Sequence, residues 1–296
     1  MAASLFSSRL LHMGLYPQPN NWQCGPFALK HALIMLGIVG DENRISRIAG
    51  ANWWEGADEI QLGRAARAYN CRLKLIRQEN PLRARRELLL ALKRGFPCLL
   101  CIEQWNHWIV VIGAEKGKLI YVDSRKHPVV CIATWAQLKR RWRYVERDDR
   151  TRKVLETMYD LHPLTPRFRV RSKARFSLKR ARYLRRPENR LLASRWNEYF
   201  DDLSAICKPR NPLSSKVFPV GELLRRHGSM IKSEVDFWHG SVQRRKLERV
   251  IKNIWFVAET YDFVIHREHE KRAIAAITAN LSLWAAATFG VEKRNA

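Results

Sequence analysis

Negative charge is scarce in this chain. Its 296 residues include 28 aspartates and glutamates against 54 lysines and arginines, which gives a formal net charge of +26. An excess of this size is typical of proteins that work beside a polyanion. A nucleic acid or an anionic membrane surface is therefore an expected partner, and charge alone does not distinguish between the two.

The chain also lacks the features of secreted and membrane-spanning proteins. Its first residues do not form a clean signal peptide. The six cysteines are irregularly spaced, which favours the reduced thiols of a cytoplasmic protein over a disulfide framework. The apolar segment 273–291 is interrupted by polar residues and rich in alanine, so we expect a buried terminal helix and not a membrane anchor.

Metal ligands at suitable spacing are missing as well. Cys98 and Cys101 form a Cys-x-x-Cys, but they lie in an apolar predicted strand, point to opposite faces and have no second pair nearby. His266, His269 and Glu270 lack a further defined ligand and fit a solvated surface. We expect neither a metal nor a cofactor.

The composition excludes general disorder, because 46% of the residues are hydrophobic and eleven are tryptophans. Within this foldable chain, a buried helix begins at a cysteine. Residues 27–36 are apolar on nearly every side, Gly25-Pro26 is a helix start signal, and Gly37 is a plausible stop. Cys24 then lies where free N–H groups and the helix dipole favour a thiolate. Such a cysteine is either a nucleophile or an ordinary buried thiol.

Further residues favour the nucleophile. His107 opens an apolar predicted strand, and Asp123 closes the next strand after a turn at residues 116–118. A hairpin of these strands can bring the carboxylate beside the imidazole and fix its tautomer. Gln18 lies six residues before Cys24, close enough to offer its amide to an oxyanion formed at the sulfur.

These blocks resemble a known family. Gln-x5-Cys-Gly-Pro opening a helix, His-x-x-Val-Val-x-Gly and a Tyr-x-Asp strand are similar to the C39-like cysteine peptidases of the papain-like class. The best-known members remove leader peptides after a double glycine and commonly precede a membrane transporter, which does not follow here. The resemblance covers about residues 10–145 and implies an α+β fold, with a helical part carrying the cysteine and an antiparallel sheet carrying histidine and aspartate.

By position, the resemblance makes Cys24 the nucleophile, His107 the base, Asp123 the orienting residue and Gln18 the oxyanion donor. One departure is the serine after Asp123, where the family often has proline. It alters the turn more than the carboxylate.

Three regions are expected: a C39-like peptidase domain at 1–147, a basic linker at 148–190, and a mostly helical domain at 191–296. Residues 167–190 contain eleven Lys or Arg and one acid, interleaved with Phe168, Phe176 and Tyr183. This pattern suits either a nucleic-acid backbone with base stacking or a solvated linker. The candidate nucleic-acid contacts are Arg180, Arg182, Arg185 and Arg186.

The last region is predicted to be helical over residues 220–227 and 235–264. Its apolar residues with core-like spacing are Phe237, Trp238, Leu247, Ile251, Ile254 and Trp255. Near the amino terminus, a short helix is predicted around residues 5–13.

The sequence therefore predicts a cysteine peptidase acting on a peptide or protein substrate. Trp53, Trp54 and Trp108 are candidate substrate contacts, although paired tryptophans also pack loops onto a core. The same acyl-thioester intermediate serves deamidation or acyl transfer, which stay open. The alternative from another class is a basic protein that binds nucleic acid or a membrane surface on a papain-like scaffold.

Overall fold

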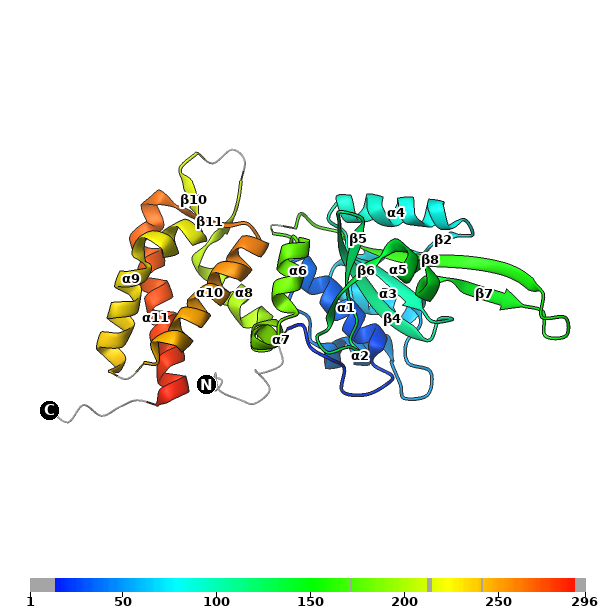
Figure 1. Ribbon diagram of the computed structural model, residues 1–296, viewed down its shortest axis with the longest axis horizontal. Helices are drawn as coiled ribbons and strands as arrows, with labels where there is room; N and C mark the ends of the chain where they lie inside the picture. Colours follow the sequence, from blue (N-terminus) through cyan, green and yellow to red (C-terminus); the bar gives the residue numbers. More distant parts are fainter. Residues whose placement is uncertain (1–13, 171, 212–214, 241, 291–296) are drawn as a thin grey trace. The chain divides into compact units, whose positions relative to one another are not determined.

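The computed structural model describes residues 14–170, 172–211, 215–240 and 242–290. These residues divide after Ser194 into two compact units. The first unit contains residues 14–194 and the second contains the described residues from 195 to 290 (Figure 1). Each unit has its own core, and the predicted helix around residues 5–13 lies outside the described residues.

Among the described residues, the first unit is built on an eight-stranded antiparallel sheet. The strand order is β1-β8-β3-β4-β5-β6, and β2 and β7 also pair with β8. The strands are β1 (Cys71–Leu73), β2 (Ile76–Gln78), β3 (Cys98–Ile102), β4 (His107–Glu115), β5 (Lys118–Val122), β6 (Val130–Thr134), β7 (Tyr144–Arg147) and β8 (Val154–Pro166).

Helices cover both faces of this sheet. The helices of the first unit are α1 (Cys24–Met35), α2 (Glu42–Ala49), α3 (Glu59–Ala68), α4 (Pro81–Lys93), α5 (Trp135–Trp142), α6 (Leu178–Leu184) and α7 (Arg190–Ser194), of which α2 packs on α1 and α3, and α7 on α6. Trp108 packs against Gly25 of α1, whereas Ile109 joins a core cluster with Leu88 of α4 and Leu138 of α5. Since neighbouring residues of a strand point to opposite faces, α1 lies on one face and α4 and α5 on the other.

The helix α1 is buried along its whole length, as the sequence predicts. Its close approach to the sheet depends on glycine at position 25. A Cβ atom there would lie 3.2 Å from Leu62 of α3 and 3.3 Å from the Trp108 ring. The α+β arrangement predicted from the sequence is confirmed.

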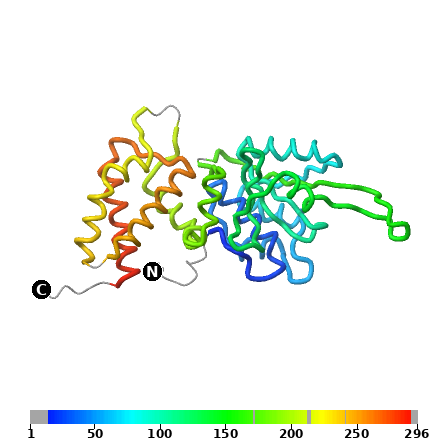
Figure 2. Tube along the Cα trace, in the orientation of Figure 1, coloured from blue at the N-terminus to red at the C-terminus, as the bar shows by residue number. Residues whose placement is uncertain are grey.

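The predicted linker at 148–190 is wrong. Strand β8 pairs with both β3 and β1 inside the sheet, and its hairpin with β7 extends far from it (Figure 2). Helix α6 contacts β5 and β6 and buries Leu178, Ala181 and Leu184. Long-range pairing thus incorporates these residues into the first unit.

The second unit is mostly helical. It contains α8 (Trp196–Ile206), α9 (Val220–His239), α10 (Arg244–Thr260) and α11 (Glu270–Phe289), with a small sheet of β9 (Lys208–Pro209), β10 (Val217–Pro219) and β11 (Phe263–His266). Helix α11 buries Ala273, Ile277, Leu281 and Ala285 on one face, as expected for a packed terminal helix. None of the helices in the described ranges has the length and apolarity needed to cross a membrane.

Two predictions for the second unit are wrong. The helix predicted to stop at residue 227 continues to His239, and Gly240 ends it with a φ of +80°. Phe237 and Trp238, predicted in the core, lie at this helix end and are 60% and 70% exposed. Leu247 is buried, but Trp255 is 39% exposed.

Candidate active site

Cys24 is the first residue of α1. The preceding Gln23 does not cap the helix with its side chain, which contacts Asn20 and Ser46 instead. The N–H groups of the first turn therefore lie beside the sulfur without a side-chain acceptor from Gln23. Cys24 is a buried residue, with 7% of its surface exposed.

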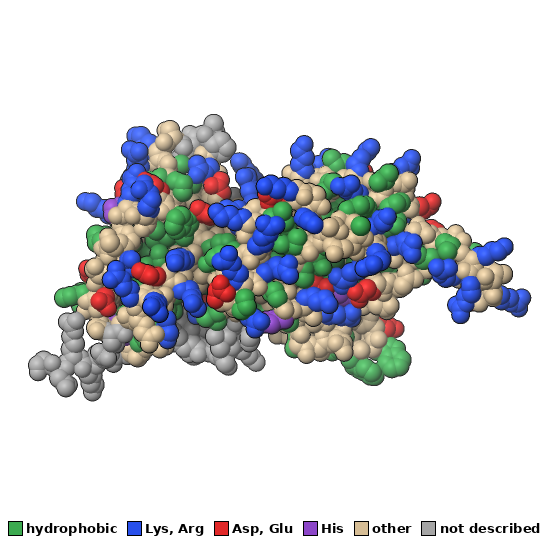
Figure 3. Space-filling view, in the orientation of Figure 1, with side chains coloured by type: hydrophobic (Ala, Val, Ile, Leu, Met, Phe, Trp, Pro, Cys, Tyr) green, Lys and Arg blue, Asp and Glu red, His purple; other side chains and the backbone are tan. Residues whose placement is uncertain are grey.

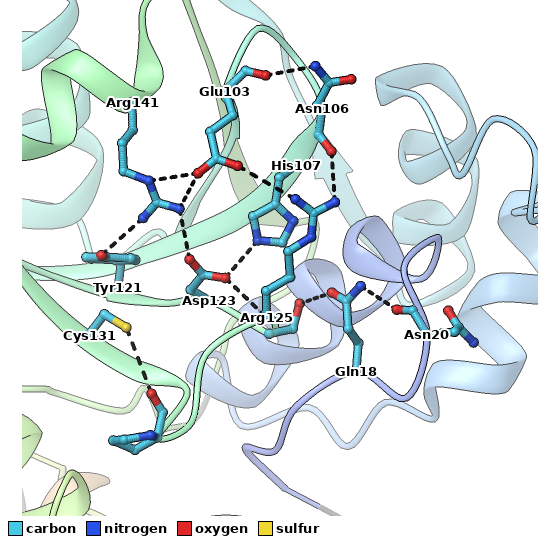
Figure 4. A network of polar contacts seen from close by, with 12 residues as sticks. Gln18, Asn20, Glu103, Asn106, His107, Tyr121, Asp123, Arg125, Cys131 and Arg141 are labelled. Atoms are coloured by element: carbon cyan, nitrogen blue, oxygen red, sulfur yellow. Dashed lines mark hydrogen bonds and ion pairs between the residues drawn. The ribbon is translucent and has the colours of Figure 1, made fainter.

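His107 and Asp123 come together as the hairpin prediction requires. Strand β4 begins at His107, β5 ends just before Asp123, and the turn between them has positive φ at Lys116 and Gly117. The ring Nε2 of His107 lies 2.7 Å from Oδ1 of Asp123, and both side chains are fully buried (Figure 4). The other ring nitrogen, Nδ1, is buried, and none of the described residues forms a hydrogen bond of ordinary geometry with it. It is the nitrogen left for the sulfur.

The electrostatics of Cys24 and His107 favour an ion pair. Burial raises the pKa of the Cys24 thiol, but interaction with His107, the main-chain N–H of Trp108 and the charge of Arg125 outweigh it and lower that pKa. Burial lowers the pKa of His107, but Asp123 and the Cys24 sulfur outweigh it and raise that pKa. The two pKa shifts have opposite signs and share one contribution, since the thiolate and the imidazolium stabilise each other.

Asp123 is held from three sides. Besides His107, Arg141 donates to its Oδ2 at 3.1 Å and the main-chain N–H of Arg125 donates to its Oδ1 at 3.1 Å. Burial alone would raise the pKa of Asp123, yet these contacts lower it to about 2. The carboxylate is therefore ionised at neutral and mildly acidic pH. Arg141 also binds Glu103 at 2.7 Å and the Tyr121 hydroxyl at 3.3 Å (Figure 4).

Sequence reasoning missed Arg141 and Glu103. Arg141 stands in a run of basic residues at the end of α5, and nothing in that run distinguishes it from Lys139 or Arg140. Only the packing of α5 beside the end of β5 selects it for Asp123.

Gln18 lies beside this network, and its side chain is already engaged. Its Oε1 accepts a hydrogen bond from the Ser124 hydroxyl, and its Nε2 donates to the Asn20 carbonyl, both at 2.5 Å. The main-chain N–H of Gln18 donates to the Ser124 carbonyl at 2.9 Å. The serine that departs from the family pattern thus attaches the Gln18 segment to the residue after Asp123. One amide hydrogen of Gln18 remains for an oxyanion, and that role stays a prediction.

The candidate substrate contacts separate into two kinds. Trp53 and Trp54 are 75% and 76% exposed, so they do not pack their loop onto the core. A Cβ atom on Gly56, at the end of that loop, would lie 3.3 Å from the Trp22 carbonyl, which places the loop beside the segment that leads to Cys24. Trp108 is only 6% exposed, and its indole donates to the Ala57 carbonyl at 2.9 Å. Its side chain therefore packs into the core, and its role as a substrate contact stays a prediction.

The other cysteines of the first unit have pKa values shifted in the opposite direction from Cys24. Burial raises the pKa of Cys71 to about 11, and it also raises the pKa values of Cys98, Cys101 and Cys131. No group of three or more metal-ligating side chains lies together in the part of the chain that the structure describes. Cys98 and Cys101 are both buried in strand β3.

The candidate nucleic-acid contacts lie on and after α6. Arg182, Arg185 and Arg186 are exposed, whereas Arg180 donates to the Arg175 carbonyl at 2.7 Å. Of the interleaved aromatics, Phe168 is exposed and Phe176 is buried. Base stacking by Phe176, as the pattern suggested, is therefore ruled out in this arrangement.

No protein-family model matches the sequence, and no curated protein does. Similar solved structures are C39 peptidase domains, each covering about half of this chain. The peptidase domain of Streptococcus ComA, a bifunctional ABC transporter, aligns with a TM-score of 0.38 at 16% identity, over 52% of this chain and 99% of its own. A double-glycine-motif protease from an AMS/PCAT transporter, solved with its leader peptide, aligns with a TM-score of 0.37 at 20% identity, over 50% and 90%. A C39-like peptidase from Bacillus anthracis aligns with a TM-score of 0.35 at 14% identity, over 52% and 95%.

Proposed function

We propose that the protein is a cysteine peptidase that cleaves a peptide or protein substrate with Cys24, His107 and Asp123. The observation that carries this proposal is the pairing of a helix-start thiol of lowered pKa with a histidine whose Nε2 lies 2.7 Å from a buried carboxylate. A merely structural buried cysteine needs none of these partners. In this protein the buried thiols without such partners have raised pKa values.

The chemistry follows from these positions. The Cys24 thiolate attacks the scissile carbonyl carbon, and a C–S bond forms as the oxygen becomes an oxyanion. The main-chain N–H of Cys24 and the free amide hydrogen of Gln18 are the donors for that oxyanion. The C–N bond then breaks, and protonated His107 gives its proton to the leaving amine.

Water completes the cycle. It attacks the thioester while His107 takes up its proton, and the C–S bond breaks to restore the thiolate. Asp123 keeps the imidazole oriented in both steps, and Arg141 holds the carboxylate in turn. Trp53 and Trp54 supply an exposed apolar surface beside the Cys24 segment for substrate side chains.

Activity-based labelling tests this proposal directly. The full chain is treated with a peptidyl vinyl-sulfone probe, and the modified residue is mapped by mass spectrometry in the native protein and in Cys24→Ala. Labelling at Cys24, absent in the variant and in His107→Ala, is expected. A native protein that stays unlabelled, or is labelled mainly at another cysteine, would contradict it.

The product then separates the reactions that share the thioester. The protein is incubated with a mixture of peptides. If a backbone amide is cleaved and water then releases the acyl group, each cleaved peptide yields two shorter fragments. A deamidase instead leaves the chain intact and converts a side-chain amide to an acid, and an acyltransferase joins the acyl group to an added amine. We expect the two fragments.

A further inference from the structure

A cleft lined by arginines lies next to the catalytic network. It has a volume of about 340 Å³, and its lining consists of Glu103, Gln104, Arg140, Arg141, Arg143, Val145 and Arg147. Arg141 connects the cleft to the active site, since its guanidinium binds Glu103 on one side and Asp123 on the other (Figure 4). A ligand in this cleft would therefore lie two side chains away from His107.

One wall of the cleft is a fixed loop. Glu103, Gln104 and Trp105 have φ values of 57°, 56° and 62°, a left-handed conformation that costs energy in residues other than glycine. The Gln104 amide exchanges two hydrogen bonds with the main chain of Val145, at 2.9 and 3.0 Å. Trp105 stacks on Tyr144 at 3.7 Å between ring centroids. These contacts hold the wall in place without a ligand.

The positive charge of the cleft is only partly neutralised. Glu103 and Asp123 occupy Arg141, which lies between them. In the described part of the chain, Arg140 and Arg143 are exposed and form no ion pair, and Arg147 donates only to the Arg152 carbonyl. Three guanidinium groups thus surround a preformed cleft with room for an acidic group.

The Glu103 carboxylate shows which chemistry the cleft accepts. Both of its oxygens meet guanidinium groups, with Oε1 bound by Arg141 at 2.7 and 3.0 Å and Oε2 3.6 Å from Arg125. Both Arg141 hydrogen bonds go to one carboxylate oxygen, and guanidinium groups are well suited to such charge-assisted contacts with carboxylates. A molecule that binds so close to Asp123 and His107 is, most simply, the one whose peptide bond is cut.

We propose that this arginine cleft binds an acidic segment of the substrate, with its Asp or Glu side chains paired to Arg140, Arg143 and Arg147. The proposal rests on the proposed peptidase function and adds a substrate class to it. The visible face of the molecule is rich in Lys and Arg over both units (Figure 3), so specific binding has to be distinguished from general attraction to a chain of net charge +26.

The test measures binding without turnover. A fluorescent hexaglutamate peptide is titrated with full-length Cys24→Ala protein at physiological ionic strength and followed by anisotropy. The cleft variant adds Arg140→Glu and Arg143→Glu. Its matched control adds Arg83→Glu and Arg86→Glu, two exposed arginines with the same spacing on α4. Arg140→Gln with Arg143→Gln serves as a milder version, and circular dichroism checks the fold of each variant.

The cleft variant should weaken hexaglutamate binding about 10-fold or more, because each exposed guanidinium–carboxylate pair contributes up to several-fold. The α4 control should lose much less. Equal losses in both variants would reduce the binding to non-specific attraction and overturn the proposal, as would the absence of measurable hexaglutamate binding. If binding of an oligothymidylate depends on Arg140 and Arg143 and binding of hexaglutamate does not, the cleft would be assigned to nucleic acid instead. Because Cys24 is already replaced, none of these results depends on whether Cys24 cuts peptides.

Discussion

Each of the two units buries a cysteine and a histidine, but the pKa of the cysteine is raised in one unit and lowered in the other. In the second unit Cys207 is fully buried, and burial alone raises its pKa to about 12. His239 there bonds the Gly290 carbonyl at 2.7 Å, and no carboxylate of the described residues pairs with it. In the first unit Cys24 is almost as buried, yet its pKa is lowered because His107, the main-chain N–H of Trp108 and the charge of Arg125 outweigh burial. Burial alone raises the pKa of a thiol and so disfavours the thiolate, whereas a positively charged partner beside the sulfur lowers that pKa.

The largest expected effect separates these two cysteines. Cys24→Ala and His107→Ala should each lower turnover of a cleaved peptide roughly 10,000-fold or more, since each removes a reacting group. Cys207→Ala should leave turnover unchanged, because its thiol has no charge partner. Turnover by purified, folded variants is measured with a fluorogenic peptide. Retained turnover in Cys24→Ala, or loss of turnover in Cys207→Ala, would contradict the assignment of Cys24 as the reactive cysteine.

Replacing the orienting carboxylate should have the next largest effect. Asp123→Asn should lower kcat roughly 1,000-fold, because the amide no longer fixes the imidazole in the reactive orientation. Asp123 raises the pKa of His107. In the variant His107 should therefore lose its proton at a lower pH, and the alkaline limb of the pH–activity profile should shift to lower pH. The pH dependence of kcat/KM measures this shift. If the alkaline limb of the profile does not shift, Asp123 does not raise the pKa of His107.

Gln18→Ala should have a smaller effect, about 100- to 1,000-fold in kcat, as for the loss of one oxyanion donor. The hydroxyl of Ser124 loses its acceptor in the same variant, so Ser124→Ala is the matched control for the loss of that contact. Ser124→Ala should retain much more activity than Gln18→Ala. Full activity of Gln18→Ala would move the oxyanion role to another donor, with Gln23 the first to test.

The smallest expected effect is on KM, and it distinguishes two exposed pairs of aromatic residues. Trp53 and Trp54 in the first unit pack edge to face at 5.2 Å, and Phe237 and Trp238 in the second unit do so at 5.5 Å. Replacing the first pair with alanine should raise KM several-fold for an apolar peptide, since a contact beside the Cys24 segment is lost, and should change stability by less than about 0.5 kcal/mol. Replacing the second pair should leave KM unchanged. Equal KM values in all of these proteins would exclude the tryptophans as substrate contacts.

Local sequence signals predict the parts of the site that local structure builds. The Gly25-Pro26 start signal locates Cys24 at a helix end, and the β4–β5 hairpin brings His107 to Asp123. Strand β8 was missed, because Asp160, His162 and Pro163 interrupt its apolar pattern and its partners β1 and β3 lie far away in sequence. Arg141 and the arginine cleft escaped prediction for a similar reason, since only tertiary packing distinguishes them within a uniformly basic chain.

The pH dependence of Cys24 alkylation tests the central claim most directly. The rate of iodoacetamide modification at Cys24, mapped by mass spectrometry, follows the fraction of thiolate. In the native protein the midpoint should lie below the ordinary thiol pKa of 9.0, because His107 outweighs burial. In His107→Ala only burial and the weaker contacts remain, so the midpoint should rise, while Cys207 stays unmodified in both folded proteins. A midpoint at or above the ordinary value in the native protein, or one that does not rise without His107, would contradict the account.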